Sequence, residues 1–261
     1  MMLLEVGNVN KAFGGVIAAR NVSFSVAAGQ MLAMIGPNGA GKSTTFNIVG
    51  GQLRPDSGTV TLLGRSIVGL PPHAIWRLGV GRTFQIAQTF VSMTVAENVQ
   101  MALISHHRRT RMLWRPARGL YRDEALMLVG KVGLSDKQGV AVSTLAYGDV
   151  KRLELAIALA SEPRLLLMDE PTAGMAAEER ARLMALTAEL VRSRGIGVLF
   201  TEHDMDAVFG YADRILVLVR GEIIAAGSVS EIRANEAVRQ VYLGNSGSLA
   251  SVRQANPARS P

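Results

Sequence analysis

The architecture of this chain can be inferred from one segment, Gly36-Pro37-Asn38-Gly39-Ala40-Gly41-Lys42-Ser43. The segment follows an apolar run, Met31–Ile35, that is typical of a buried strand, and a helical pattern over Thr44–Val49 comes after it. Between a strand and a helix, such a glycine-rich loop points backbone N–H groups and a helix N-terminus at phosphate oxygens. Lys42 is placed for the β- and γ-phosphates and the Ser43 hydroxyl for Mg²⁺. The segment therefore predicts a nucleoside triphosphate site, and the alternative is a glycine-rich turn that binds nothing.

The composition limits the class of protein. The chain has 261 residues, 48% of them apolar, which is enough for one α/β core with an added subdomain. It contains no cysteine, which excludes disulfides and thiolate metal sites and fits a cytosolic protein. No apolar run approaches the ~18 residues that a membrane-spanning helix needs, and the N-terminus lacks the pattern of a signal peptide. We therefore expect a protein without a membrane span.

The net charge of +7 indicates an anionic partner, which could be a nucleotide, a nucleic acid or an acidic membrane surface. The basic residues gather in segment 106–118, which holds His106-His107-Arg108-Arg109-Thr110-Arg111 and then Arg115 and Arg118. A solvated helix end or loop is the simplest interpretation, and contact with acidic lipid headgroups or a membrane partner is the alternative. The adjacent histidines make a poor metal site, because no further ligand lies at helical spacing.

The order of predicted elements indicates an α/β fold. Residues 3–63 are expected to form short strands around the phosphate loop, including Val22–Val26 and Thr59–Leu62, in an N-terminal antiparallel β portion. Helical patterns then cover Val95–Ile104, Tyr121–Val132 and Val150–Ala160, and apolar strands at Leu165–Met168, Val198–Phe200 and Ile215–Val219 alternate with a helix over Ala177–Arg194. This alternation predicts a mostly parallel sheet covered on both faces, with an inserted α-helical subdomain at about 88–160. The domain is expected to cover 1–244, and the polar tail 245–261 to be disordered.

Two carboxylates follow the buried strand Leu165–Met168. Asp169 and Glu170 therefore lie at the carboxyl end of a strand, where open α/β sheets bind their ligands. Asp169 is predicted to hold Mg²⁺ through its hydration shell, and Glu170 to polarise the attacking water. The alternative is a pair of solvated acids at the start of a loop.

Two further polar residues stand where predicted strands end. His203 follows the strand Val198–Phe200 and is predicted to donate a hydrogen bond to the γ-phosphate, although a lone histidine is more often structural. Gln85 ends Gly81-Arg82-Thr83-Phe84-Gln85, where a strand meets the helical segment. An amide at this position can ligate Mg²⁺ and lose that contact when the subdomain rotates; a surface glutamine is the alternative.

The segment Leu145-Ala146-Tyr147-Gly148-Asp149 precedes the amphipathic helix predicted over Val150–Ala160. Within one chain it offers only a turn and a helix N-terminus. Such a terminus can bind an anion, but nothing in the sequence places it on this chain's own nucleotide.

Taken in order, the phosphate loop, Gln85, Leu145–Asp149, Asp169-Glu170 and His203 resemble the ATP-binding subunit of ABC transporters over about residues 3–243. Within that family the chain most resembles the ATPase subunits of branched-chain amino-acid importers. This narrower resemblance rests on Arg82–Gln85, Leu145–Asp149, Arg152–Ala156, Glu202–Met205, Val241–Gly244 and the basic segment. Relatives in this branch also serve urea, amides or aromatic acids, so uptake of one of these compounds is the alternative.

The resemblance implies roles for individual residues. Two ATPase subunits would meet head to tail around two ATP molecules with Mg²⁺, so that Ala146–Asp149 of one subunit touches the ATP held by the other. Phe13 matches the aromatic residue that stacks on adenine; a core phenylalanine is the alternative. The residues implied to bind nucleotide are Phe13, Gly36, Pro37, Asn38, Gly39, Ala40, Gly41, Lys42, Ser43, Thr44, Gln85, Ala146, Tyr147, Gly148 and Asp149, those implied to bind metal are Ser43, Gln85 and Asp169, and the catalytic residues are Glu170 and His203.

Two positions depart from the family pattern. The general signature has Ser at position 146, whose hydroxyl contacts the opposite γ-phosphate, and this chain has Ala146. Many relatives have Asp or Asn where this chain has Ala176. The first departure predicts a weaker closed dimer, because a hydrogen bond to a charged group is worth about 1.5–3 kcal/mol. The second puts cross-talk between the two sites in doubt.

The resemblance also implies partners and a location. It implies two integral-membrane permease subunits, a second ATPase subunit that is either a related chain or an identical copy, and indirectly a periplasmic substrate-binding protein. It places the chain peripherally on the cytoplasmic face of the bacterial inner membrane. The competing hypotheses are an ATP-switched module that binds nucleic acid or ribosomes, which the basic charge permits, and a catalytically silent regulatory subunit, which Glu170 and His203 argue against. A P-loop kinase or GTPase fits the phosphate loop alone, but no guanine-reading Asn-Lys-x-Asp pattern is present.

Overall fold

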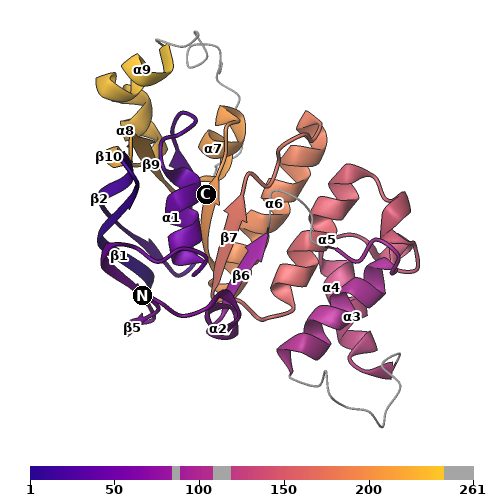
Figure 1. Ribbon diagram of the computed structural model, residues 1–261. Helices are drawn as coiled ribbons and strands as arrows, with labels where there is room; N and C mark the ends of the chain where they lie inside the picture. Colours follow the sequence, from indigo (N-terminus) through magenta and orange to yellow (C-terminus); the bar gives the residue numbers. More distant parts are fainter. Residues whose placement is uncertain (84–88, 108–118, 244–261) are drawn as a thin grey trace.

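A computed structural model describes residues 1–83, 89–107 and 119–243 (Figure 1). The strands are β1 (Met2–Phe13), β2 (Val16–Ala27), β3 (Met31–Ile35), β4 (Ser57–Leu62), β5 (Arg65–Ser66), β6 (Val80–Thr83), β7 (Leu165–Asp169), β8 (Gly197–Thr201), β9 (Arg214–Val219) and β10 (Glu222–Gly227). The helices are α1 (Lys42–Val49), α2 (Pro72–Arg77), α3 (Val95–His106), α4 (Arg122–Lys131), α5 (Tyr147–Leu159), α6 (Ala177–Arg194), α7 (Met205–Tyr211), α8 (Val229–Ala234) and α9 (Glu236–Leu243), with short 3₁₀ turns η2 (Ser135–Lys137) and η3 (Val142–Thr144).

Two sheets form the core. The first has the order β2-β1-β4-β5, and its pairs are antiparallel. The second has the order β10-β9-β3-β8-β7-β6 and is parallel except for the edge pair β9 and β10. Strand β3 is buried at every residue, as a central parallel strand covered on both faces should be. The predicted α/β class with an N-terminal antiparallel portion is confirmed.

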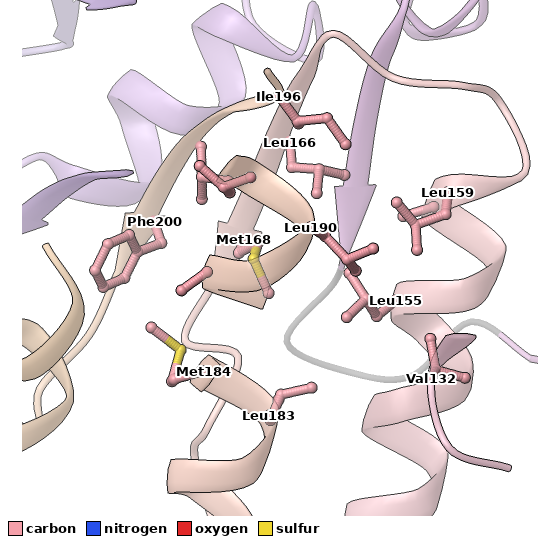
Figure 2. Packing of buried hydrophobic residues seen from close by; sticks show 14 of the residues in the cluster. Val132, Leu155, Leu159, Leu166, Met168, Leu183, Met184, Leu190, Ile196 and Phe200 are labelled. Carbon is pink, nitrogen blue, oxygen red and sulfur yellow. The ribbon is translucent and has the colours of Figure 1, made fainter. Parts of the chain in front are cut away.

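One apolar cluster lies between the two sheets and around α1, with Phe46, Leu32 and Leu199 among its members. A second cluster covers the opposite face of the parallel sheet and continues into the helical part of the chain. Figure 2 shows how Leu166 of β7 and Leu155 of α5 belong to this second cluster. Helix α5 is therefore packed into the same core as the strands that end in Asp169 and Thr201.

The helical part of the chain comprises α3, α4 and α5, and Figure 1 shows it to one side of the parallel sheet. Thr94 caps α3 in a box with Glu97, which fixes where that helix begins. Ring contacts hold the end of α3: His106 meets Trp76 edge-on at 5.5 Å, and His107 stacks on Tyr121 at 4.4 Å, both measured between ring centroids. The basic residues 108–118 and Gln85 lie outside the described residues. The boundaries of the helical subdomain stay a prediction.

Two local expectations were wrong. Strands β1 and β2 are long, twelve residues each, rather than short, and register shifts along their pairing allow them to continue through Asn8 and Asn21, both at positive φ. Helix α5 begins at Tyr147 rather than at Val150, so Tyr147–Asp149 form its first turn. In the described part of the chain, none of the helices combines the length and the apolar character that crossing a membrane requires.

Candidate functional site

The phosphate loop runs from the buried end of β3 into α1. Gly39 and Gly41 have left-handed backbones, with φ of +78° and +100°, which a glycine adopts without strain. A cavity of about 200 Å³ opens over this loop. It is lined by Val16, Ile17, Ala18, Asn38, Gly39, Ala40, Gly41, Lys42, Ser43, Thr44 and Glu170. The fold thus brings the predicted loop and the predicted catalytic carboxylate to one cavity.

Lys42 is buried and folds back over its own loop. Its Nζ donates hydrogen bonds to the carbonyl oxygens of Gly36 at 2.7 Å and Pro37 at 3.1 Å. Burial lowers the pKa of Lys42 below its ordinary 10.5, and the negative charges of Glu170 and Asp169 oppose that shift. The ammonium group is therefore a poorly solvated cation. Its attraction to an anion such as a phosphate is stronger than to the two carbonyl oxygens, so a phosphate is expected to replace them.

The two predicted carboxylates lie where β7 ends, and a neighbouring strand holds them. The Thr201 hydroxyl, fully buried at the end of β8, donates to Asp169 Oδ1 at 2.7 Å and accepts the Glu170 N–H at 3.0 Å. Arg82 adds a cation 3.9 Å from the Asp169 carboxylate. Because one hydroxyl serves both residues, the Asp169 carboxylate and the Glu170 backbone keep a fixed relation.

Glu170 and His203 meet directly. His203 Nε2 lies 2.8 Å from Glu170 Oε1, and the His203 side chain is half exposed. Glu170 has a left-handed backbone, with φ of +47°, which is uncommon outside glycine and clusters at functional sites. This pair at the edge of the phosphate-loop cavity can polarise a water molecule and donate a hydrogen bond to an anion.

The segment Ala146–Asp149 forms the N-terminus of α5. Ala146 occupies the N-cap with no side-chain cap, Tyr147 is exposed with the Lys151 ammonium 5.5 Å from its ring, and Gly148 is buried. The Asp149 carboxylate points into its own chain, where Lys137 and Arg152 both donate to it. These contacts argue against the predicted direct role of Asp149 in nucleotide binding. They indicate that Asp149 stabilises the first turn of α5.

Helix α5 lies away from the phosphate loop. Figure 1 shows α1 and α5 separated by β6, β7 and α6. The described residues that line the phosphate-loop cavity come from β2, the loop, α1 and Glu170. The exposed residues Ala146 and Tyr147 at the start of α5 therefore lie outside this chain's own phosphate-loop cavity.

Phe13 lies at the end of β1, about half exposed, with Lys11 Nζ 5.4 Å from its ring centroid. The interpretation as a core phenylalanine is wrong, since its ring faces solvent. Val16 and Ile17, also exposed, follow it at the start of β2 and reach the phosphate-loop cavity. An apolar wall beside a phosphate site suits the flat face of a base.

Several residues that shape this site were not predicted from the sequence. Thr201 and Glu202 are buried polar residues that follow the apolar run of β8, and that contrast is the signal that could have identified them. Gln85, predicted to bind nucleotide and metal, lies outside the described residues. Within the described ranges, no three His, Asp or Glu side chains converge on one point that could hold a metal ion.

Two family models match the chain. The model described as "ABC transporter" matches residues 19–173, which include the phosphate loop, Ala146–Asp149 and Asp169-Glu170. The model described as "Branched-chain amino acid ATP-binding cassette transporter" matches residues 222–247.

Individual relatives match over nearly the whole chain. The high-affinity branched-chain amino acid transport ATP-binding protein LivG of Salmonella typhimurium is 39% identical over 252 residues, which cover 93% of this chain and 98% of LivG. The lipopolysaccharide export system ATP-binding protein LptB of Acidithiobacillus ferridurans is 37% identical over 243 residues, which cover 93% of this chain and 97% of LptB. Comparable identity thus extends to relatives that are named for different cargo.

Solved structures agree with the fold. The ADP conformation of MJ1267, an ATP-binding cassette of an ABC transporter, superposes with a TM-score of 0.84 at 32% identity, covering 94% of this chain and 99% of that one. A dimeric post-hydrolysis state of the ATP-binding cassette MJ0796, bound to ADP and Pi, gives a TM-score of 0.74 at 26% identity, covering 87% and 99%. The chain therefore belongs to the family of ABC transporter ATP-binding proteins, the ATPases of these transporters, and its similarity to LivG places it beside those of branched-chain amino acid transport.

Proposed function

We propose that this chain hydrolyses Mg·ATP at the cavity of the phosphate loop and thereby drives uptake of branched-chain or related amino acids through separate permease subunits. The observation that carries the hydrolytic part is the 2.8 Å contact between Glu170 and His203 at the edge of the cavity that holds Lys42. The cargo rests on the match of residues 222–247 and on the name of relatives such as LivG.

The chain's own residues divide the work of hydrolysis. Lys42 and the loop N–H groups bind the phosphates, and Glu170 accepts a proton from water as the water attacks the γ-phosphorus. The bond from the γ-phosphorus to the β-phosphate oxygen breaks, and ADP and phosphate are formed. Before ATP binds, His203 Nε2 contacts Glu170 Oε1 and holds it in place. With ATP bound, the His203 ring would exchange this contact for a hydrogen bond to the γ-phosphate.

Mg²⁺ fits the donor set at this site. Ser43 is exposed at the start of α1, and Thr201 holds Asp169; a hydroxyl and a carboxylate are the hard oxygen ligands that this ion prefers. When bound, the ion would neutralise charge on the phosphate oxygens. Gln85 remains a predicted third ligand.

The second half of each site comes from another ATPase subunit. The N-terminus of α5, where Ala146 and Tyr147 are exposed, would bind the γ-phosphate of an ATP held by the facing chain. The dimeric cassette MJ0796 is a precedent for such pairing in the family. ATP would favour the closed dimer because it binds both halves, and hydrolysis would remove the group they share. The permease subunits place the chain at a membrane as part of a transport complex.

The decisive variant is Glu170→Gln. We expect ATP turnover to fall at least about a hundredfold, since a general base contributes about 10²–10⁴. ATP binding and ATP-dependent dimerisation should persist. The matched control is Glu189→Gln, an exposed carboxylate on α6 remote from the β7 end. Undiminished turnover in Glu170→Gln would remove the hydrolytic assignment, and uptake assays in a strain lacking the gene would test the cargo.

A further inference from the structure

Glu202 is a buried carboxylate that the proposed reaction does not use. It follows β8, is 3% exposed, and stands in sequence between Thr201 and His203, which both contact the candidate site. Its Oε1 accepts the Thr172 N–H at 2.8 Å and the Thr172 hydroxyl at 2.6 Å, and its Oε2 accepts the His203 N–H at 3.2 Å. One side chain thus joins the backbone of His203 to the loop that follows Glu170.

The neighbours of Glu202 hold the same loop. Thr201 binds Asp169 and the Glu170 N–H, and His203 contacts the Glu170 carboxylate. Three consecutive residues at the end of β8, Thr201 to His203, therefore bind the segment that follows β7. Of the three, Glu202 binds it furthest along the chain, at Thr172.

Beyond Thr172 the loop reaches the N-terminus of α5. A β-carbon on Gly174 would stand 3.6 Å from the Tyr147 ring, so the loop and Tyr147 are in van der Waals reach. The segment that Glu202 holds therefore extends from the catalytic pair to the helix end proposed to meet the other subunit's ATP.

The chemistry at this position demands a carboxylate. All three partners of Glu202 are donors, and an ionised carboxylate only accepts. In a glutamine at this position, the side-chain NH₂ would face a donor of the protein, either the Thr172 N–H or the His203 N–H. Since a buried polar group without a partner is costly, the loop or His203 would shift to relieve it.

We infer that Glu202 is a positioning residue for hydrolysis, a role that rests on the proposed function of Glu170 and His203. It touches no substrate. It fixes the loop from Pro171 to Gly174 against His203, so that Glu170 meets His203 and Gly174 meets Tyr147 at the same time.

The test compares the full-length variants Glu202→Gln, Thr172→Val and Thr172→Ser. Valine removes the hydroxyl that donates a hydrogen bond to Glu202, and serine keeps that hydroxyl. We expect Glu202→Gln and Thr172→Val to lower kcat by about ten- to a hundredfold, the scale of a misplacement of about 1 Å. ATP affinity, measured by equilibrium titration, should stay within about twofold of the original chain, since the phosphate loop is untouched. Thr172→Ser should keep kcat close to that of the original chain.

Glu189→Gln is the control for loss of a carboxylate, and thermal unfolding of each variant is measured in parallel. Equal kcat for Thr172→Val and Thr172→Ser would overturn the inference, as would a Glu202→Gln variant with full kcat. A fall in ATP affinity that matches the fall in kcat would also overturn it, because it would indicate general loss of structure. If Glu202→Gln fails to fold, the threonine pair alone decides. Full turnover in Glu170→Gln would instead defeat the proposed function, so the two failures are distinguishable.

Discussion

Gly41 lies against the backbone of Ala18 so closely that a β-carbon on Gly41 would stand 2.1 Å from the Ala18 carbonyl oxygen. The start of α1 is therefore built against β2, and the phosphate loop takes its shape partly from the antiparallel sheet. Gly39, two residues earlier, also has a left-handed backbone, but a β-carbon there would meet nothing within 4 Å. The two glycines separate the cost of backbone strain from the cost of collision.

Gly41→Ala should destabilise the fold more than Gly39→Ala. A left-handed alanine costs about 1–2 kcal/mol at either position. At Gly41, overpacking against a carbonyl adds about 1–3 kcal/mol. Urea denaturation of both variants measures the difference. Equal free energies of unfolding for the two variants would show that Ala18 of β2 moves aside without a measurable cost. The shape of the loop would then not depend on the antiparallel sheet.

Phe13→Ala should weaken ATP binding with little effect on stability, because the ring is half exposed in the free protein. Aromatic stacking is worth about 0.5–1.5 kcal/mol beyond area burial, or about two- to twelvefold in Kd. Phe13→Tyr should retain the affinity. Inorganic tripolyphosphate, which has no base to stack, provides the internal control: its affinity should be the same for all three proteins. Loss of tripolyphosphate affinity in Phe13→Ala would place the ring in the structure of the loop instead.

Asp149→Asn should lower stability most at neutral pH. Burial alone would raise the pKa of Asp149, but hydrogen bonds and charge from Lys137 and Arg152 outweigh it and hold the pKa below the ordinary 3.8. A depressed folded-state pKa contributes stability above 3.8 that is lost as pH falls through the lower folded value. The cost of Asp149→Asn, about 1–3 kcal/mol at pH 7 for partners left unsatisfied, should therefore shrink as pH falls below 3.8.

The control for Asp149 is the exposed pair of Arg182 and Glu178, also on one helix face, with side chains 72% and 78% exposed. Glu178→Gln should change the free energy of unfolding by no more than about 0.5 kcal/mol. Denaturation of both variants at pH 7 and at pH 3 makes the comparison. A pH-independent cost for Asp149→Asn would show that its charge is irrelevant to the fold.

The sequence predicts the core of this protein well because the decisive signals are local. The phosphate loop needs its glycines at fixed spacing between a strand and a helix, and the buried strands β3, β7 and β8 are short apolar runs that few other structures accommodate. Helix α6 runs from Ala177 to Arg194 as its pattern indicated, ending at Gly195 with a left-handed backbone.

What the sequence does not predict depends on contacts between distant residues. The bridging hydroxyl of Thr201 and the buried Glu202 become informative only when β8 lies beside β7. Asp149 looks like part of a ligand segment until Lys137, twelve residues earlier, is seen to bind it. Pairing of β1 with β2 likewise carries both strands past residues that look like turns.

Both departures from the family pattern fall on the same kind of position. Ala146 is the N-cap of α5 and Ala176 the N-cap of α6, each with the extended backbone that a cap requires and with no side-chain cap. Two other helices of this chain do carry reciprocal capping boxes: Thr94 with Glu97 at α3, and Ser228 with Glu231 at α8. The two alanines are therefore missing caps, besides any role they have toward nucleotide.

Ala146→Ser and Ala176→Ser should each raise the free energy of unfolding by about 0.5–2 kcal/mol, because the serine hydroxyl accepts an N–H of the first turn. Ala176→Ser also completes a box with Glu179, whose carboxylate now lies 2.9 Å from where a β-carbon on Gly148 would stand. Only Ala146→Ser should in addition strengthen ATP-dependent dimerisation, since its hydroxyl would face the other subunit's γ-phosphate, a bond worth about 1.5–3 kcal/mol. Urea denaturation measures the first effect and analytical ultracentrifugation with ATP the second. Thr94→Ala, which removes an existing cap, should lower the free energy of unfolding by a similar amount. Equal dimerisation of the two serine variants would separate Ala146 from the nucleotide and leave it a helix cap alone.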